Sequence, residues 1–221
     1  MVLLVHHSVS PQSRKIRLIM AEKKMLYVLK EEEPWNLSEE MQEINPSGEL
    51  PILVFDGTVI SGNNAITEYL EESNPQYKLL PENPLERAEV RRLTEWFDLK
   101  FYNEVYKYIV TEKIVKRFQL KQAPNSKILK AGLNNLKFHL EYIDYLADRN
   151  NYLAGKELSL ADLTAAAHLS IIDYLGDIPW NDYKYAKIWY AKIKSRPSFK
   201  DILKDTIRGI RPSGNYTNLD F

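Results

Sequence analysis

The side chains of this chain that could do chemistry are hydroxyls, carboxylates and histidines, because none of its 221 residues is a cysteine. Without a thiolate, the chain alone cannot carry out dithiol reduction, form a disulfide or ligate zinc through sulfur. Ser10 is the most suggestive hydroxyl, since it stands with Pro11 at the start of a predicted helix. A serine in that position commonly accepts a hydrogen bond from the free N–H groups of the first helical turn. Helix capping is therefore one role for Ser10, and Ser8 and Ser13 are weaker candidates.

The histidines do not suggest a metal site. His6 and His7 stand at the end of a predicted strand, and His139 and His168 are isolated on predicted helices. None of the four has a partner at metal-ligand spacing. We expect them to be inert and expect no bound metal.

The charge balance argues against polyanionic partners. Thirty basic and thirty acidic residues give a formal net charge of +0 at pH 7, so no long-range field favours nucleic acid or an anionic membrane. The N-terminal apolar run Val2–Val5 is too short for a signal peptide, and no run approaches the roughly 18 residues of a membrane helix. We expect a cytoplasmic protein with no nucleic-acid or membrane partner.

The segment from Asn45 to Ile66 predicts a β-hairpin followed by a helix. Asp56-Gly57 between two apolar runs is a two-residue hairpin signal, because its turn needs positive φ values that both residue types tolerate. Pro51 cannot donate to a sheet ladder, so we expect it at the start of the first strand. Gly62-Asn63 then precedes a helix from about Asn64 to Glu72.

The remaining elements form a β-α-β unit followed only by helices. Val2–His6 is typical of a buried strand, Arg14–Lys24 of a helix and Tyr27–Lys30 of a second strand, and this order implies a right-handed crossover. A short helix is predicted over Ser38–Glu43. The prolines at 75, 81 and 84 mark a linker. Every element predicted after it is a helix: about 85–121, 126–149, 161–175, 182–194 and 198–208.

This ordered set resembles the glutathione transferases over roughly Val2 to Lys204. The strand opened by Pro51 and its hairpin match the family's glutathione-binding half, and the box Ser159-x-x-Asp162 matches the start of its core helix. The resemblance implies an α/β plus all-α fold. It would have a thioredoxin-like N-terminal domain (1–78), an all-helical C-terminal domain (84–208) and a tail (209–221). It also implies a homodimer.

The resemblance also implies a binding site for glutathione. Ser10 lies where the family places the hydroxyl that activates the glutathione thiol. Leu50, before a cis proline at Pro51, would pair its main chain with the cysteinyl part of the tripeptide. Gly62 and Asn63 stand where the family has Glu-Ser, so Asn63 can meet the γ-glutamyl carboxylate but Gly62 has no charge for the ammonium. We expect glutathione to be a weakly bound co-substrate in a pocket without a carboxylate for its amino end.

Two functions follow from these resemblances. As a transferase, the chain would conjugate glutathione to an apolar electrophile through a thiolate stabilised by Ser10. A predicted helix face would line the electrophile pocket or, alternatively, serve as core or dimer contact. Its residues are Trp96, Tyr102, Tyr106 and Tyr108.

The last ten residues carry the alternative function. They are rich in turn formers and end in an acidic, aromatic sequence, which is typical of a frayed terminus rather than a helix. The tail also resembles that of α-proteobacterial glutathione-transferase-like proteins that bind filaments of the division protein FtsZ. This resemblance implies a non-enzymatic module of cell division. The expected contacts with FtsZ are Trp35, Tyr216, Leu219, Asp220 and Phe221.

Overall fold

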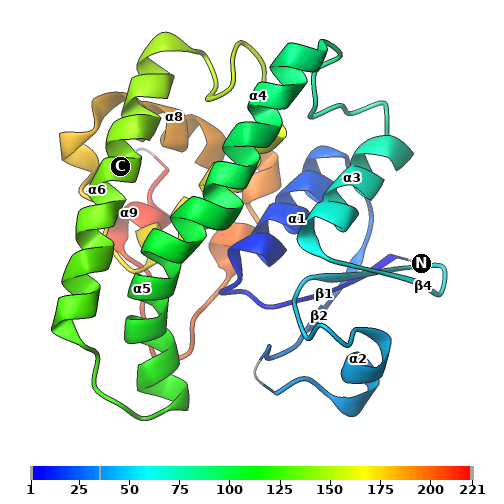
Figure 1. Cartoon of the computed structure of the whole chain (residues 1–221), viewed down its shortest axis with the longest axis horizontal. Coiled ribbons are helices and arrows are strands. Elements are labelled where there is room, and N and C mark those ends of the chain that lie inside the picture. The colour runs from blue at the N-terminus through cyan, green and yellow to red at the C-terminus, as the bar shows by residue number, and fades with distance from the viewer. Residues whose placement is uncertain (1, 35, 220–221) are drawn as a thin grey trace.

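The N-terminal part of the chain folds around a four-stranded mixed sheet, seen at the right of Figure 1. The computed structural model describes residues 2–34 and 36–219. The strand order is β2-β1-β3-β4, with β1 parallel to β2, antiparallel to β3, and β3 antiparallel to β4. The strands are β1 (Val2–His6), β2 (Val28–Glu31), β3 (Ile52–Phe55) and β4 (Thr58–Ser61). The predicted thioredoxin-like arrangement is confirmed.

Three helices accompany this sheet: α1 (Pro11–Glu22), α2 (Glu39–Ile44) and α3 (Asn63–Ser73). α1 and α3 lie side by side on one face of the sheet, with α2 on the other side in the view of Figure 1. α1 begins three residues earlier than predicted, at Pro11, because proline suits the first helical position and Ser10 caps the helix.

The hairpin has the predicted two-residue turn. Asp56 and Gly57 have φ values of 46° and 82°, so both lie in the left-handed region that this turn requires. The peptide bond between Leu50 and Pro51 is cis, as the family resemblance implies. The turn leads the chain from β3 into β4, which ends at Ser61, two residues before α3 begins at Asn63.

The C-terminal part is helical, as predicted. Residues 84–119 form one long helix in which α-type and π-type hydrogen bonding alternate: α4 (Pro84–Glu95), η1 (Trp96–Tyr106), α5 (Lys107–Val110) and η2 (Thr111–Gln119). It packs beside α6 (Ser126–Arg149) and α7 (Leu160–Tyr174), and α8 (Lys184–Lys194) packs against α6 and α7 in turn. Over the described ranges, no helix has the length and apolar character needed to cross a membrane.

α7 is the central helix, and all of its residues are buried. Its capping box is present: the Asp162 carboxylate accepts from the Ser159 N–H at 3.0 Å and from the Ser159 hydroxyl at 2.9 Å. The same carboxylate accepts from the Trp189 indole N–H at 2.9 Å, which ties α7 to α8. The box thus fixes both the start of the core helix and a neighbouring helix.

The predicted helix over 198–208 is wrong. The chain there makes only two 3-10 turns, η4 (Pro197–Phe199) and η5 (Ile202–Lys204). Arg17 of α1 explains the interruption. Its guanidinium donates to the Asp201 carbonyl at 3.2 Å and to both Asp205 oxygens at 2.7 and 2.9 Å. The Asp201 carbonyl, which would accept from the Asp205 N–H in a continuous helix, accepts from Arg17 instead, and the Asp205 N–H donates to the Ile202 carbonyl at 3.1 Å.

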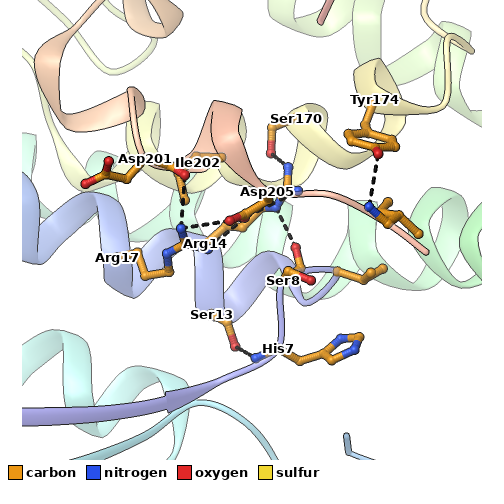
Figure 2. A network of polar contacts seen from close by, with 12 residues as sticks. His7, Ser8, Ser13, Arg14, Arg17, Ser170, Tyr174, Asp201, Ile202 and Asp205 are labelled. Atoms are coloured by element: carbon orange, nitrogen blue, oxygen red, sulfur yellow. Dashed lines mark hydrogen bonds and ion pairs between the residues drawn. The ribbon is translucent and has the colours of Figure 1, made fainter. Parts of the chain in front are cut away.

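Arg14, Arg17 and Asp205 form a buried group that we call the tail cluster (Figure 2). Arg14 is fully buried and donates to the Ser8 carbonyl at 2.7 Å and to the Ser170 hydroxyl at 2.8 Å. Its second terminal nitrogen lies 3.6 Å from the Asp205 carboxylate. The tail cluster therefore fastens the C-terminal segment to α1 and α7.

The tail is not frayed over its described residues. Gly214–Thr217 form a helical turn, α9, capped by the Ser213 side chain. Tyr216 is fully buried, stacks edge-on against Tyr174 at 5.0 Å and donates to the Ile202 carbonyl at 2.7 Å. The expectation of a tail without helix is corrected, because one aromatic side chain with a satisfied hydroxyl anchors it in the core.

Candidate functional site

A cavity of about 1190 Å³ lies between the two parts of the chain. On the N-terminal side it is lined by all five predicted glutathione-site residues, Ser10, Leu50, Pro51, Gly62 and Asn63. On the helical side its walls come from α4, η1, α5 and η2. The fold thus brings together segments that are more than fifty residues apart in the sequence.

Ser10 lies at the wall of this cavity as the N-cap of α1. Its hydroxyl oxygen accepts from the Ser13 N–H at 3.2 Å and its hydroxyl lies 3.3 Å from the Gln12 side-chain oxygen, to which it donates. Next to it, the Tyr106 hydroxyl donates to the Val9 carbonyl at 2.9 Å. Ser10 is therefore placed beside the cavity, and its hydroxyl already has partners within its own helix turn.

Leu50 and Pro51 face the cavity across from α1. Within the described residues, no hydrogen bond uses the Leu50 main-chain N–H or carbonyl. A strand edge with a free donor and a free acceptor can pair with an extended peptide. This part of the wall can therefore hold the main chain of a peptide ligand without any particular side chain.

Gly62 and Asn63 stand where β4 passes into α3. Gly62 has a φ of 93°, a conformation that favours glycine, and it provides no side-chain cap for α3. The Asn63 amide nitrogen donates to an Asp98 carboxylate oxygen at 2.8 Å. The amide expected to meet the ligand carboxylate is thus already bonded to the helical part of the protein.

Asp98 is the centre of a group that we call the cavity cluster: Lys15, Asn63, Asp98 and His168. The Asp98 carboxylate accepts from the fully buried Lys15 ammonium at 2.8 Å and lies 3.1 Å from the His168 ring nitrogen. Burial would raise the pKa of Asp98, but the Lys15 charge and the His168 hydrogen bond outweigh it and hold the pKa well below its usual range. Asp98 therefore remains a carboxylate that joins α1, α3, η1 and α7.

His139 and His168, both on helices of the C-terminal part, have hydrogen-bond partners from other helices. His168 bonds to Asp98, and His139 accepts from the Trp96 indole N–H at 3.0 Å while its other ring nitrogen lies 3.0 Å from Glu104. Burial lowers the pKa of both rings, that of His139 to about 4. Both histidines are neutral and bonded on the helical side. Among the described residues, no group of three or more acidic or histidine side chains is arranged to hold a metal ion.

The cavity wall also contains carboxylates that the sequence interpretation missed. Glu49, Glu68 and Glu95 all line it. Glu68 is paired with Arg91 at 2.9 Å, whereas Glu49 and Glu95 form no ion pair with a described residue. The cavity therefore contains carboxylates, and the expectation that none of them receives the amino end of glutathione stays a prediction. The position of Glu68, about one helical turn after Asn64 on α3, was the available sequence signal.

The predicted aromatic face divides between the cavity and other surroundings. Tyr102 and Tyr106 line the cavity and stack on each other with ring centroids 4.8 Å apart. Trp96 instead packs against α6, with its ring 4.7 Å from that of Tyr142. Tyr108 is exposed. Only two of the four aromatic residues can contact a ligand in the cavity.

The structure describes two of the five residues expected to contact FtsZ, Tyr216 and Leu219. Tyr216 is buried, so its side chain is not accessible to a partner in this conformation. Leu219 is exposed, at 41% of its possible surface. Trp35, Asp220 and Phe221 lie outside the described residues.

Comparisons with known proteins agree with this architecture. The sequence model of the glutathione S-transferase N-terminal domain matches residues 9–73. The chain is 44% identical to FtsZ-localized protein A of Caulobacter vibrioides, over 99% of this chain and 97% of that protein.

Solved structures give the same result. A glutathione S-transferase from Rhodospirillum rubrum F11 superposes with a TM-score of 0.98 at 50% identity, covering 100% of both chains. FzlA from C. crescentus superposes with a TM-score of 0.96 at 43% identity, covering 100% of this chain and 99% of that one. A Populus trichocarpa glutathione transferase, at 23% identity and a TM-score of 0.79, shares the fold over 91% of this chain and 97% of its own. The chain therefore belongs to the glutathione S-transferase family.

Proposed function

We propose that this chain acts as a homodimer that binds FtsZ, and that its interdomain cavity binds glutathione only weakly. The observation that carries this proposal is the similarity to FtsZ-localized protein A, which extends over 97% of that protein at 44% identity. Similarity over the whole length includes the C-terminal segment that continues beyond the α8 helix. The simplest interpretation is that this chain has the same cellular role as that relative.

The cavity geometry supports the weak binding of glutathione. The Asn63 amide is bonded to Asp98, and Gly62 offers no side chain to a γ-glutamyl group. Losing one charge-assisted hydrogen bond costs about 1.5–3 kcal/mol, which is roughly tenfold to a hundredfold in affinity. The carboxylates of Glu49 and Glu95 can still attract the ammonium group of glutathione, so we expect the cavity to keep some affinity for it.

The tail is the proposed FtsZ contact. Tyr216 anchors α9 in the core, which leaves the residues after it to reach a partner. Leu219 supplies an exposed apolar side chain there, and Trp35, Asp220 and Phe221 complete the proposed contact set.

Co-sedimentation with polymerised FtsZ tests this proposal. A chain ending at Thr217 keeps the anchored α9 and removes only the last four residues. We expect it to stay in the supernatant at concentrations where the full chain pellets with FtsZ. An unchanged pellet would show that the tail is not the contact. A full chain that does not pellet at all would refute FtsZ binding itself.

Light scattering during size-exclusion chromatography tests the dimer, which should have twice the 25.8 kDa chain mass.

A second candidate function is glutathione conjugation. It is favoured by the cavity-lining position of Ser10 at the N-terminus of α1, opposite a free Leu50 main chain. A thiolate there would meet the positive end of the helix dipole. Calorimetric titration with reduced glutathione tests this function. A dissociation constant below about 1 mM supports it, and the absence of heat up to several times that concentration counts against it.

A further inference from the structure

A second, separate cavity lies where η2 meets the segment after α8. It has a volume of about 390 Å³. Its lining residues are Glu112, Lys113, Arg117, Pro124, Leu175, Gly209, Ile210 and Arg211. None of these described residues lines the interdomain cavity, so η2 presents a different face to each.

The turn that forms one wall is rigidly held. Ile207 and Ile210 face each other across it, with the Ile210 N–H donating to the Ile207 carbonyl at 3.0 Å. The Tyr174 hydroxyl of α7 accepts from the Ile207 N–H at 3.0 Å (Figure 2) and donates to the Ile210 carbonyl at 2.8 Å. One buried hydroxyl therefore clamps both ends of the turn.

Gly209 allows this turn to lie against η2. Its φ is 77°, and a Cβ atom built there would be only 2.7 Å from the Phe118 ring. Any other residue type would push Phe118 away from the turn. Arg211 of this segment and Arg117, which lies one residue before Phe118 on η2, line the same cavity, and Arg208 is the chain neighbour of Gly209.

These three arginines are a local excess of positive charge on a chain with a net charge of +0. Lys113 and Lys116 nearby are neutralised by Asp177 and Glu112 at 2.5 and 2.6 Å. Arg117, Arg208 and Arg211 are exposed and form no ion pair with any other described residue. The wall therefore offers free guanidinium groups that suit carboxylates.

The floor between these charges is apolar. Leu175, Ile210 and Pro124 line it, and Phe118, which lies against Gly209, is 38% exposed. A nucleic acid or a lipid surface would require a broad basic face, whereas here Glu112 and Asp177 lie among the basic residues. A short peptide that combines acidic and apolar side chains matches both features.

We propose that this surface, made by Arg117, Arg211 and the cavity floor, binds an acidic, apolar peptide segment of a protein partner. Carboxylates of the peptide pair with the two arginines, and one apolar side chain rests on Leu175 and Ile210. The proposal does not depend on residues 218–221, which the FtsZ truncation removes, or on FtsZ. Its failure would leave the proposed function untouched, and the reverse also holds.

Fluorescence anisotropy with a defined probe tests it. The probe is a fluorescein-labelled Asp-Leu-Glu-Phe-Asp-Leu-Glu peptide, and its control is the uncharged Asn-Leu-Gln-Phe-Asn-Leu-Gln peptide. We expect saturable binding of the acidic probe only. Its binding should weaken as NaCl rises from about 50 to about 300 mM, because salt screens the attraction between the arginines and the carboxylates of the peptide. The double variant Arg117→Glu/Arg211→Glu should lose about tenfold or more in affinity.

A matched variant separates a specific surface from general charge. Arg149→Glu makes the same exchange at one exposed arginine at the end of α6, which is half the charge change of the double variant, and should leave binding unchanged. Thermal unfolding of both variants checks that they remain folded. Three results would overturn the proposal: no binding of the acidic probe, equal binding of the neutral probe, or equal loss in both variants. Tighter, Arg117-dependent binding of a single-stranded oligonucleotide or of phosphatidylserine vesicles would also overturn it.

Discussion

The two sides of α1 carry buried ion pairs of similar chemistry but different accessibility. The cavity cluster joins Lys15 to Asp98, and the tail cluster joins Arg14 and Arg17 to Asp205. Asp98 and Asn63 also line an open cavity, whereas the tail cluster is covered by α9, with the Arg14 guanidinium 5.9 Å from the Tyr216 ring. A ligand can compete with the first set of contacts but cannot reach the second. The cavity cluster is therefore open to small molecules, and the tail cluster is closed to them.

Removing the carboxylate of the cavity cluster should have the largest effect. Asp98→Ala leaves the fully buried Lys15 ammonium without its counter-charge. We expect the free energy of unfolding to fall by about 3–5 kcal/mol, as measured by urea denaturation, because an unpaired buried charge is strongly destabilising.

Two further variants make this prediction specific. Asp148→Ala removes an exposed carboxylate next to Arg149 and should change stability by less than about 0.5 kcal/mol. The double variant Lys15→Met/Asp98→Leu should recover most of the stability lost by Asp98→Ala. If it does not, the loss comes from packing and not from the unpaired charge.

The tail side can be tested in the same way. Tyr216→Ala removes a fully buried ring and its bond to the Ile202 carbonyl, so we expect a loss of about 3–4 kcal/mol in urea unfolding. Tyr216→Phe keeps the ring and should lose only about 1 kcal/mol. Ending the chain at Thr217 should leave stability within about 0.5 kcal/mol of the full chain. A large loss on that truncation would mean that the last residues also belong to the core.

The elements predicted well are those whose signals are local. The Asp56-Gly57 turn needs only two residues with positive φ, and the Ser159–Asp162 box needs only one helical turn. The helix predicted over 126–149 has those bounds in the structure, because Asn125 caps its start through two backbone N–H groups. Local chemistry was sufficient in each case.

The predictions that failed concern segments whose structure depends on residues far away in the sequence. The helix predicted over 198–208 has acceptable local propensity, but Arg17, more than 180 residues away, holds the Asp201 carbonyl and Asp205 outside a helix. Likewise, motif spacing located Asn63 but could not show that Asp98 of another domain occupies its amide. The family resemblance therefore places the pocket, and only the packed structure shows which of its groups are free.

His139, in the helical part, makes stability depend on pH. Neutral His139 accepts from Trp96 and donates to Glu104, and burial lowers its pKa to about 4, below the usual 6.5 of the unfolded chain. Between about pH 6.5 and pH 4 the unfolded chain binds the extra proton, so stability is lost as the pH falls through this window. We expect His139 to account for about 2–3 kcal/mol of the loss between pH 7 and pH 4.5.

His139→Gln is the control, because an amide can make the same two hydrogen bonds without titrating. Urea unfolding at both pH values should show a smaller pH dependence for this variant than for the unchanged chain. Equal dependence would assign the acid sensitivity to other groups, such as His6, whose pKa burial also lowers to about 4.

The smallest effect concerns Ser10 and separates its two roles. As the N-cap of α1, its hydroxyl accepts from the Ser13 N–H, so Ser10→Ala should cost about 1 kcal/mol in urea unfolding. Ser38→Ala is a matched control, since Ser38 caps α2 in the same way, away from the cavity. If Ser10 is only a cap, the two variants lose stability alike and keep the same glutathione affinity and conjugation rate as the unchanged chain. If Ser10 also stabilises a thiolate, its variant alone loses about tenfold or more in rate, because one hydrogen bond to a charged group is worth about 1.5–3 kcal/mol. Such a loss of rate would show that the cavity is a working active site.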